Sequence, residues 1–143
     1  MNIQDFKRSM EFTLKWEGGY SNDPNDPGGE TKWGISKKSY PNLDIKNLSE
    51  QEAVNIYLKD YWFEAGCDSL GYPMNLVVFD SAVNCGVGTA KKWLRESETP
   101  AEVIEMRKAY YINLAMRKPA MSKFLKGWLN RIQDLQKIVA ITS

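Results

Sequence analysis

Three polar side chains near the start of the chain have the types and the spacing that cleavage of a sugar bond requires. Glu17 is followed nine residues later by Asp26, and Thr31 follows after another five. Glycoside hydrolysis needs one carboxyl group that donates a proton and a second carboxylate that stays ionised. The sequence therefore predicts a site in which Glu17 is the acid, Asp26 orients a water or shields developing positive charge, and Thr31 positions that water.

Glu17 ends a predicted helix on the same side as the apolar residues of that helix. At about 100° per residue, Phe6, Met10 and Leu14 fall within about 60° of Glu17. A carboxyl group among apolar side chains prefers its neutral form, so its pKa rises and it can donate a proton near neutral pH. The competing interpretation is that Glu17 only ends the helix and that the next loop is a surface turn.

The loop after Glu17 carries residues that suit a sugar cleft. Gly28 and Gly29 let the backbone approach a glycan closely, and Tyr20 and Trp33 are candidates for packing against sugar faces. A calcium site in the Asp-Pro-Asn-Asp run of this loop is disfavoured, because prolines disturb it and its spacing misses the EF-hand pattern.

Asp80 and Asn84 are four residues apart and share one face of a predicted helix. The surrounding segment, MNLVVFDSAV over 74–83, is apolar on nearly every side, which predicts a central buried helix, although periodicity alone also allows a strand. One hypothesis places Asp80 and Asn84 at the cleft, where they hydrogen-bond an N-acetyl or hydroxyl group. In the other, they satisfy backbone groups of a loop.

Start and stop signals predict the elements that hold these residues. The expected helices, besides the central one, cover 3–16, a short stretch 36–40, a stretch from the capping box at 49–52 to about 62, 99 to about 117, and a last helix with an apolar seam from 125 to 139. Thr31–Ile35 is expected to be extended. Lys118, Lys123 and Lys126 cluster near the last helix, where a solvated face is favoured over contact with an anionic wall polymer.

The composition argues against several kinds of catalysis other than carboxylate chemistry. The 143 residues include no histidine, so a Ser-His or Cys-His hydrolase would lack its base and a His-liganded zinc enzyme its metal ligands. We therefore expect neither a metal nor another cofactor. A formal net charge of +1 gives no general basic field, so nucleic-acid binding is not expected. The 43% share of hydrophobic residues supports one folded domain with a core of its own.

The two cysteines and the first residues bear on where the protein works. Cys67 and Cys85 are expected to be free thiols, with a bridge between them as the alternative. The N-terminal segment is charged and gives no signal peptide, and no stretch approaches the ~20 apolar residues of a spanning helix. We expect a monomer, made in the cytoplasm and not stably inserted in a membrane, that reaches its substrate after holin-like release.

The pattern around Glu17 resembles a known family. Glu17-Gly-Gly-Tyr20, followed by Asp-Pro-x-Asp-Pro-Gly-Gly-Glu-Thr-Lys-Trp-Gly-Ile-Ser over 23–36, is similar to glycoside hydrolase family 108, a group of lysozyme-like N-acetylmuramidases among phage endolysins and bacterial enzymes. The similarity continues through Asp80-Ser-Ala-Val-Asn84-Cys-Gly and into the run 124–131. The catalytic glutamate of the family corresponds to Glu17, whereas Asp26 and Thr31 match the triad of phage-type lysozymes only in their spacing.

The resemblance implies a fold and an activity. The fold would be a mainly α, lysozyme-like single domain over 1–143 with a short β segment beside the active-site cleft. About 95–143 would correspond to the family's peptidoglycan-binding region, packed on the same core. The activity would be cleavage of the β-1,4 bond between N-acetylmuramic acid and N-acetylglucosamine in peptidoglycan glycan strands, by a bacteriolytic phage or prophage endolysin. A lytic transglycosylase and a non-catalytic cell-wall-binding or virion module are the alternatives.

Overall fold

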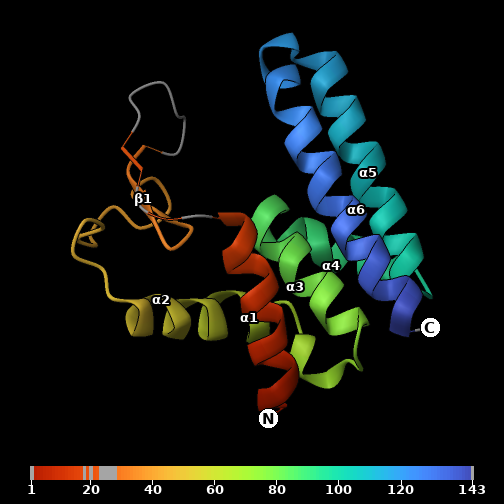
Figure 1. Ribbon diagram of the computed structural model, residues 1–143, viewed down its shortest axis with the longest axis horizontal. Helices are drawn as coiled ribbons and strands as arrows, with labels where there is room; N and C mark the ends of the chain where they lie inside the picture. The colour runs from red at the N-terminus through yellow and green to blue at the C-terminus, as the bar shows by residue number, and fades with distance from the viewer. Residues whose placement is uncertain (1, 18, 20, 23–28, 143) are drawn as a thin grey trace.

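The computed structural model describes residues 2–17, 19, 21–22 and 29–142, and helices carry most of this part of the chain (Figure 1). The α-helices are α1 (Ile3–Glu17), α2 (Glu50–Tyr57), α3 (Met74–Cys85), α4 (Val87–Arg95), α5 (Pro100–Arg117) and α6 (Leu125–Thr142). Shorter helical turns are η1 (Leu58–Phe63, a π-helix), η2 (Cys67–Ser69) and η3 (Pro119–Phe124). The strands β1 (Thr31–Lys32) and β2 (Ile35–Ser36) complete the elements.

Helix α3 lies at the centre of the molecule, in contact with α1, α4 and α5 (Figure 1). Every residue from Asn75 to Ala82 is buried, including the polar Asn75, Asp80 and Ser81. Because neighbours cover α3 on all sides, its sequence lacks the polar stripe of a surface helix. The predicted central helix is therefore confirmed, and the strand alternative is wrong.

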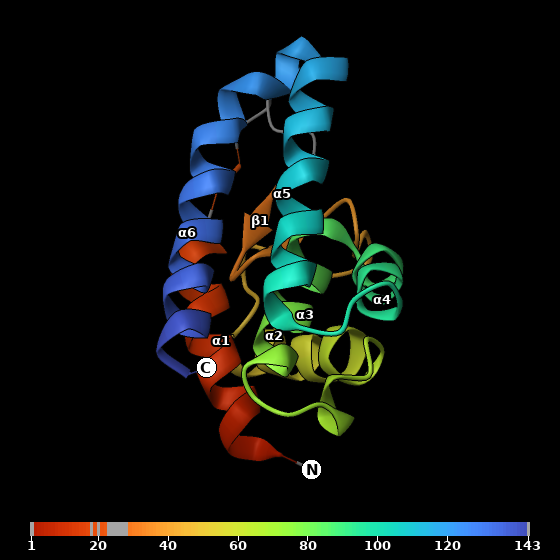
Figure 2. The ribbon, with the colours of Figure 1, turned by 90° about the vertical axis from the view of Figure 1, so that its right-hand side faces the viewer.

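Helices α5 and α6 form an antiparallel hairpin that η3 closes at one end, and this end projects beyond the body of the molecule (Figures 1 and 2). At the other end the hairpin joins the core. Ile132, Leu135 and Val139 of α6 pack in one cluster with Phe12 of α1 and Leu76 of α3. The apolar seam predicted for the last helix thus attaches the C-terminal helices to the same core as α1 and α3.

The β segment is a hairpin, which corrects the predicted single extended segment. Strand β1 pairs with β2 antiparallel, with Thr31 opposite Ser36, and Ser21 bridges to Thr31 on the other side. The chain reverses at Trp33 and Gly34, which both have positive φ, 55° and 78°. The expected helix over 36–40 is also wrong, since Ser36 belongs to β2 and residues 37–39 form turns.

Local signals located most helix starts correctly. Ser49 and Glu52 form the predicted capping box of α2, and Thr99 caps α5 by accepting from the backbone of Glu102. Helix α4 was not predicted, because Gly86 indicated the end of the preceding helix and not the start of another. Cys67 and Cys85 are free thiols, as expected. Within the described residues, no helix has the length and apolar character needed to cross a membrane.

Candidate active site

Glu17 is the last residue of α1 and is half-buried, with 21% of its side chain exposed. On the apolar side of the same helix, Phe6 and Met10 are buried and Leu14 packs against them. Burial raises the pKa of Glu17 above its ordinary value, although the charge of Arg131 acts in the opposite direction. The structure thus gives Glu17 the environment that its place on the helix predicts.

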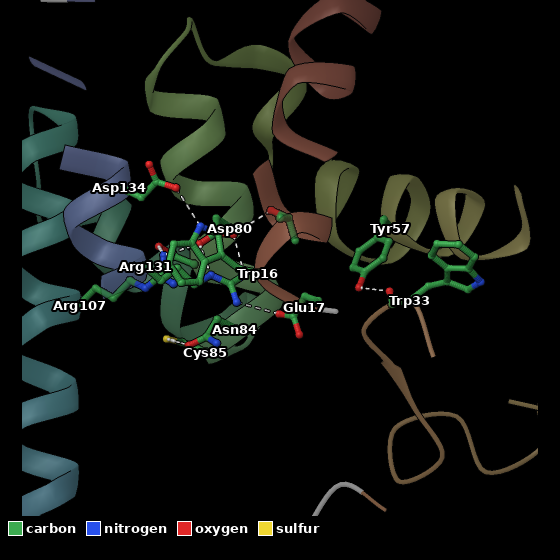
Figure 3. A network of polar contacts seen from close by, with 12 residues as sticks. Trp16, Glu17, Trp33, Tyr57, Asp80, Asn84, Cys85, Arg107, Arg131 and Asp134 are labelled. Carbon is green, nitrogen blue, oxygen red and sulfur yellow. Dashed lines mark hydrogen bonds and ion pairs between the residues drawn. The ribbon is translucent and has the colours of Figure 1, made fainter. Parts of the chain in front are cut away.

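Arg131 of α6 ties Glu17 to a buried charge cluster (Figure 3). Its Nη1 donates to Oε1 of Glu17 at 3.1 Å, and its Nη2 and Nε donate to the Asp80 carboxylate at 2.7 and 3.0 Å. Asp80 also accepts from Arg107 at 2.9 Å and from Thr13 at 2.8 Å. One carboxylate in the central helix therefore fixes two arginines, and one of these holds the candidate acid.

Asp80 stays ionised in this cluster. Burial alone would raise its pKa, but the positive charges of Arg131 and Arg107 lower the pKa to about 2. Its exposed fraction is 0%, so it has no surface to offer a sugar. The expectation that Asp80 faces the cleft is wrong, and its partners are side chains rather than loop backbone. A carboxylate between two buried arginines satisfies charges that would otherwise be costly to bury.

The turn of the β hairpin packs directly against Glu17. A Cβ added to Gly34 would lie 2.9 and 3.0 Å from Cβ and Cγ of Glu17 and would clash with the Tyr57 hydroxyl. That hydroxyl donates to the Trp33 carbonyl at 2.7 Å, which fixes the turn on the end of α2 (Figure 3). Only a residue without a side chain fits between the hairpin, α2 and the candidate acid.

A pocket of about 360 Å³ opens beside Glu17, between the ends of α1 and α3 and the segment formed by η3 and α6. Its described lining consists of Trp16, Glu17, Asn84, Lys123, Phe124, Gly127, Trp128 and Arg131. Asn84 thus faces this pocket, as one of the two hypotheses for it requires. The Tyr111 hydroxyl donates to its Oδ1. The indole of Trp16, another lining residue, donates to Asp134 at 3.0 Å, and this hydrogen bond holds the Trp16 side chain in place.

The other predicted site residues are not part of this pocket in the described structure. Asp26, Tyr20 and Gly28 lie outside the described residues. Thr31 belongs to β1, and the Trp33 indole donates to the Leu48 carbonyl at 3.2 Å.

Gly29, next to this strand, has a φ of 69°, a backbone conformation that favours glycine. The prediction of substrate contacts for Gly29 and Trp33, and of a water-positioning role for Thr31, stays a prediction.

The sequence carries a signal for the two buried arginines. Arg131 falls on the apolar seam of α6, between Trp128 and Leu135, and Arg107 falls on the buried side of α5. A charged residue on an apolar seam needs a buried partner of opposite charge. Asp80, the acid of the apolar central helix, was the natural candidate.

Comparisons with known proteins identify the family and the fold. The sequence profile described as Glycosyl hydrolase 108 matches residues 10–86, more than half of the chain. The chain belongs to glycosyl hydrolase family 108. This family 108 member is therefore a glycoside hydrolase. The matched region includes Glu17, Asp80 and Asn84, whereas the two buried arginines, Arg107 and Arg131, lie beyond it.

The fold of this family 108 member is shared with a solved structure. The structure of Brucella abortus SagA superposes with a TM-score of 0.81 at 24% sequence identity, over 97% of this chain and 95% of that chain. The predicted mainly α, lysozyme-like fold with a short β segment is confirmed. No curated protein sequence matches the chain.

Proposed function

We propose that this family 108 hydrolase is an N-acetylmuramidase that cuts the β-1,4 bond after N-acetylmuramic acid, with Glu17 as the proton donor. The observation that carries the proposal is the environment of Glu17. Its carboxyl group is half-buried at the wall of a pocket, has a raised pKa, and is held by Arg131 at 3.1 Å. A neutral acid at a pocket wall is the group that glycoside hydrolysis requires first.

In the proposed reaction, Glu17 gives its proton to the glycosidic oxygen as the bond from C1 to that oxygen breaks. The positive charge of Arg131 then stabilises the carboxylate that Glu17 becomes. A water molecule adds its oxygen to C1 and its released proton restores the acid. Asp26 would orient this water or shield the positive charge at C1, and Thr31 would position the water. The choice between inversion and retention depends on the distance between Glu17 and its partner carboxylate.

Family membership supports a peptidoglycan-hydrolase role more broadly. We further propose that the enzyme acts as a monomer on peptidoglycan glycan strands, as a bacteriolytic phage or prophage endolysin released from the cytoplasm by a holin-like factor. The proposal of no cofactor rests on the carboxylate chemistry of Glu17.

Product analysis of digested peptidoglycan tests the bond and the reaction class together. Purified sacculi are digested, the products are reduced with borohydride, and mass spectrometry identifies the new ends. A muramidase leaves reduced N-acetylmuramic acid. Anhydro-muramic ends would show a lytic transglycosylase, reduced N-acetylglucosamine would show cleavage of the other glycosidic bond, and an unchanged polymer would show a non-catalytic wall-binding module.

A further inference from the structure

The pocket beside Glu17 offers almost only hydrogen-bond donors. Lys123 and Arg131 are cations without acceptor atoms. The Oδ1 atom of Asn84 already accepts from Tyr111, and its amide nitrogen has no hydrogen-bond partner among the described residues. Apart from Glu17, which is to carry a proton, the described side chains of the pocket provide no free oxygen acceptor. A neutral sugar hydroxyl needs both kinds of partner, whereas a carboxylate only accepts.

The stretch of chain from the middle of α5 to the middle of α6 carries cations and no acidic residue. Between Glu105 and Asp134 the chain contains no acidic residue. Its cations in this stretch are Arg107, Lys108, Arg117, Lys118, Lys123, Lys126 and Arg131. Arg107 and Arg131 form ion pairs with Asp80 and Glu17. Of the remaining cations, Lys123 lines the pocket.

Stacked aromatic rings hold the wall of the pocket in place. Trp128 stacks on Tyr111 with ring centroids 4.8 Å apart and planes 17° apart, and Phe124 lies 5.8 Å from Trp128. The ammonium of Lys123 lies 5.2 Å from the centre of the Phe124 ring, so a cation stands at the edge of an apolar surface. The volume of about 360 Å³ falls within the range of small-ligand sites.

We propose that this pocket binds a carboxylate-bearing substituent of the glycan strand next to the scissile bond, with Lys123 and the Asn84 amide as its ligands. This inference rests on the proposed function, because it takes peptidoglycan as the substrate. Two sources of carboxylate are available there: the peptide stem and, where the stem is absent, the lactyl group. The pocket would thus select strands with acidic substituents over neutral polymers of N-acetylglucosamine.

The test compares Lys123→Gln with Lys126→Gln, a matched change at a neighbouring exposed lysine outside the pocket. Initial rates are measured on three soluble glycan oligomers: with stem peptides, with stem peptides whose carboxylates are amidated, and without peptides. We expect Lys123→Gln to raise KM about fivefold to tenfold on the first, with kcat little changed, since a lysine–carboxylate hydrogen bond is lost. On the amidated oligomer, Lys123→Gln and wild type should agree. A rise in KM that persists on peptide-free strands would assign the pocket to the lactyl carboxylate.

Equal effects of Lys123→Gln and Lys126→Gln, or an equal effect on amidated oligomers, would overturn the inference. Failure of the proposed function is distinguishable, because wild type would then release no N-acetylmuramic acid reducing ends from any oligomer. In that case, calorimetric binding of a disaccharide tripeptide and of its amide still decides the question. Tighter binding of the free acid, lost in Lys123→Gln alone, supports the pocket, and equal binding of the two contradicts it.

Discussion

The guanidinium of Arg131 donates to Glu17 at 3.1 Å, although Glu17 is the group that has to carry a proton. A cation so close lowers the pKa of a carboxyl group, yet burial outweighs this effect and the pKa of Glu17 is raised. Asp80 explains how Glu17 can be bound by Arg131 and still have a raised pKa. It receives two hydrogen bonds from Arg131, at 2.7 and 3.0 Å, and its own negative charge raises the pKa of Glu17. Arg131 therefore fixes the acid in place without forcing it to ionise.

Replacing Arg131 with methionine should shift the pH dependence of activity upward. The charge of Arg131 lowers the pKa of Glu17, so its removal lets Glu17 keep its proton to higher pH. The alkaline limb of kcat/KM against pH should move to higher pH. The variant should also lose about 3–5 kcal/mol of stability, because Asp80 is left partly unpaired. Arg131→Lys, which keeps the charge, is the control, and an alkaline limb that moves in Arg131→Lys as far as in Arg131→Met would argue against the electrostatic explanation.

Asp80 should make the protein sensitive to acid. Its pKa is about 2 in the folded protein against an ordinary value of 3.8, so its stabilising effect is complete above about pH 4 and is lost as the pH falls through 2. This difference corresponds to about 2 kcal/mol. Urea unfolding from pH 5 to 2 should show the loss in wild type and a flatter dependence in Asp80→Asn, which should be about 3–5 kcal/mol less stable at pH 7.

Glu11→Gln is the control for this acid dependence, because Glu11 is an exposed acid of α1 outside the cluster. Its unfolding curves should follow those of wild type at each pH. An acid dependence that remains unchanged in Asp80→Asn would show that the buried cluster does not cause it.

Gly34→Ala should damage both stability and catalysis. The new Cβ would clash with the Tyr57 hydroxyl and press on Glu17, and the φ of 78° is strained for any residue with a side chain. We expect a loss of about 1–3 kcal/mol in thermal unfolding and a fall in kcat through displacement of Glu17. Gly88→Ala, in α4 with open space around its Cβ position, should be neutral or stabilising. Equal behaviour of the two variants would mean that the hairpin turn does not position Glu17.

The sequence predicted the elements whose causes are local. Three such elements are α2, α3 and α5. The signals that predict them lie within the helices or next to them: the capping box at Ser49, the apolar run of α3, and the cap and proline at the start of α5. The stripe that places Glu17 among apolar residues is local as well, and the structure reproduces it. Helix α4 was not predicted because Gly86 both ends α3 and precedes the first residue of α4.

The charge cluster could not be predicted in the same way. Arg131 is 114 residues from Glu17 and 51 from Asp80, and only packing of α6 on α1 and α3 brings them together. The sequence places Arg131 and Asp80 on apolar helix faces, but it does not show which acid pairs with which arginine. For the same reason the sequence left two hypotheses open for Asp80, the cleft or a loop backbone, whereas its partners are the buried arginines.

The most direct test of the account is the activity of Glu17→Gln on purified peptidoglycan. Glutamine keeps the size and a hydrogen-bond acceptor for Arg131 but has no proton to donate. Since Glu17 is the proposed general acid, release of reducing ends should fall by about 10²–10⁴-fold. The circular dichroism spectrum should be unchanged. The variant should be no less stable than wild type at neutral pH, because a group with a raised folded pKa loses its contribution as the pH rises through that pKa. A folded Glu17→Gln that releases reducing ends at the wild-type rate would contradict the central claim.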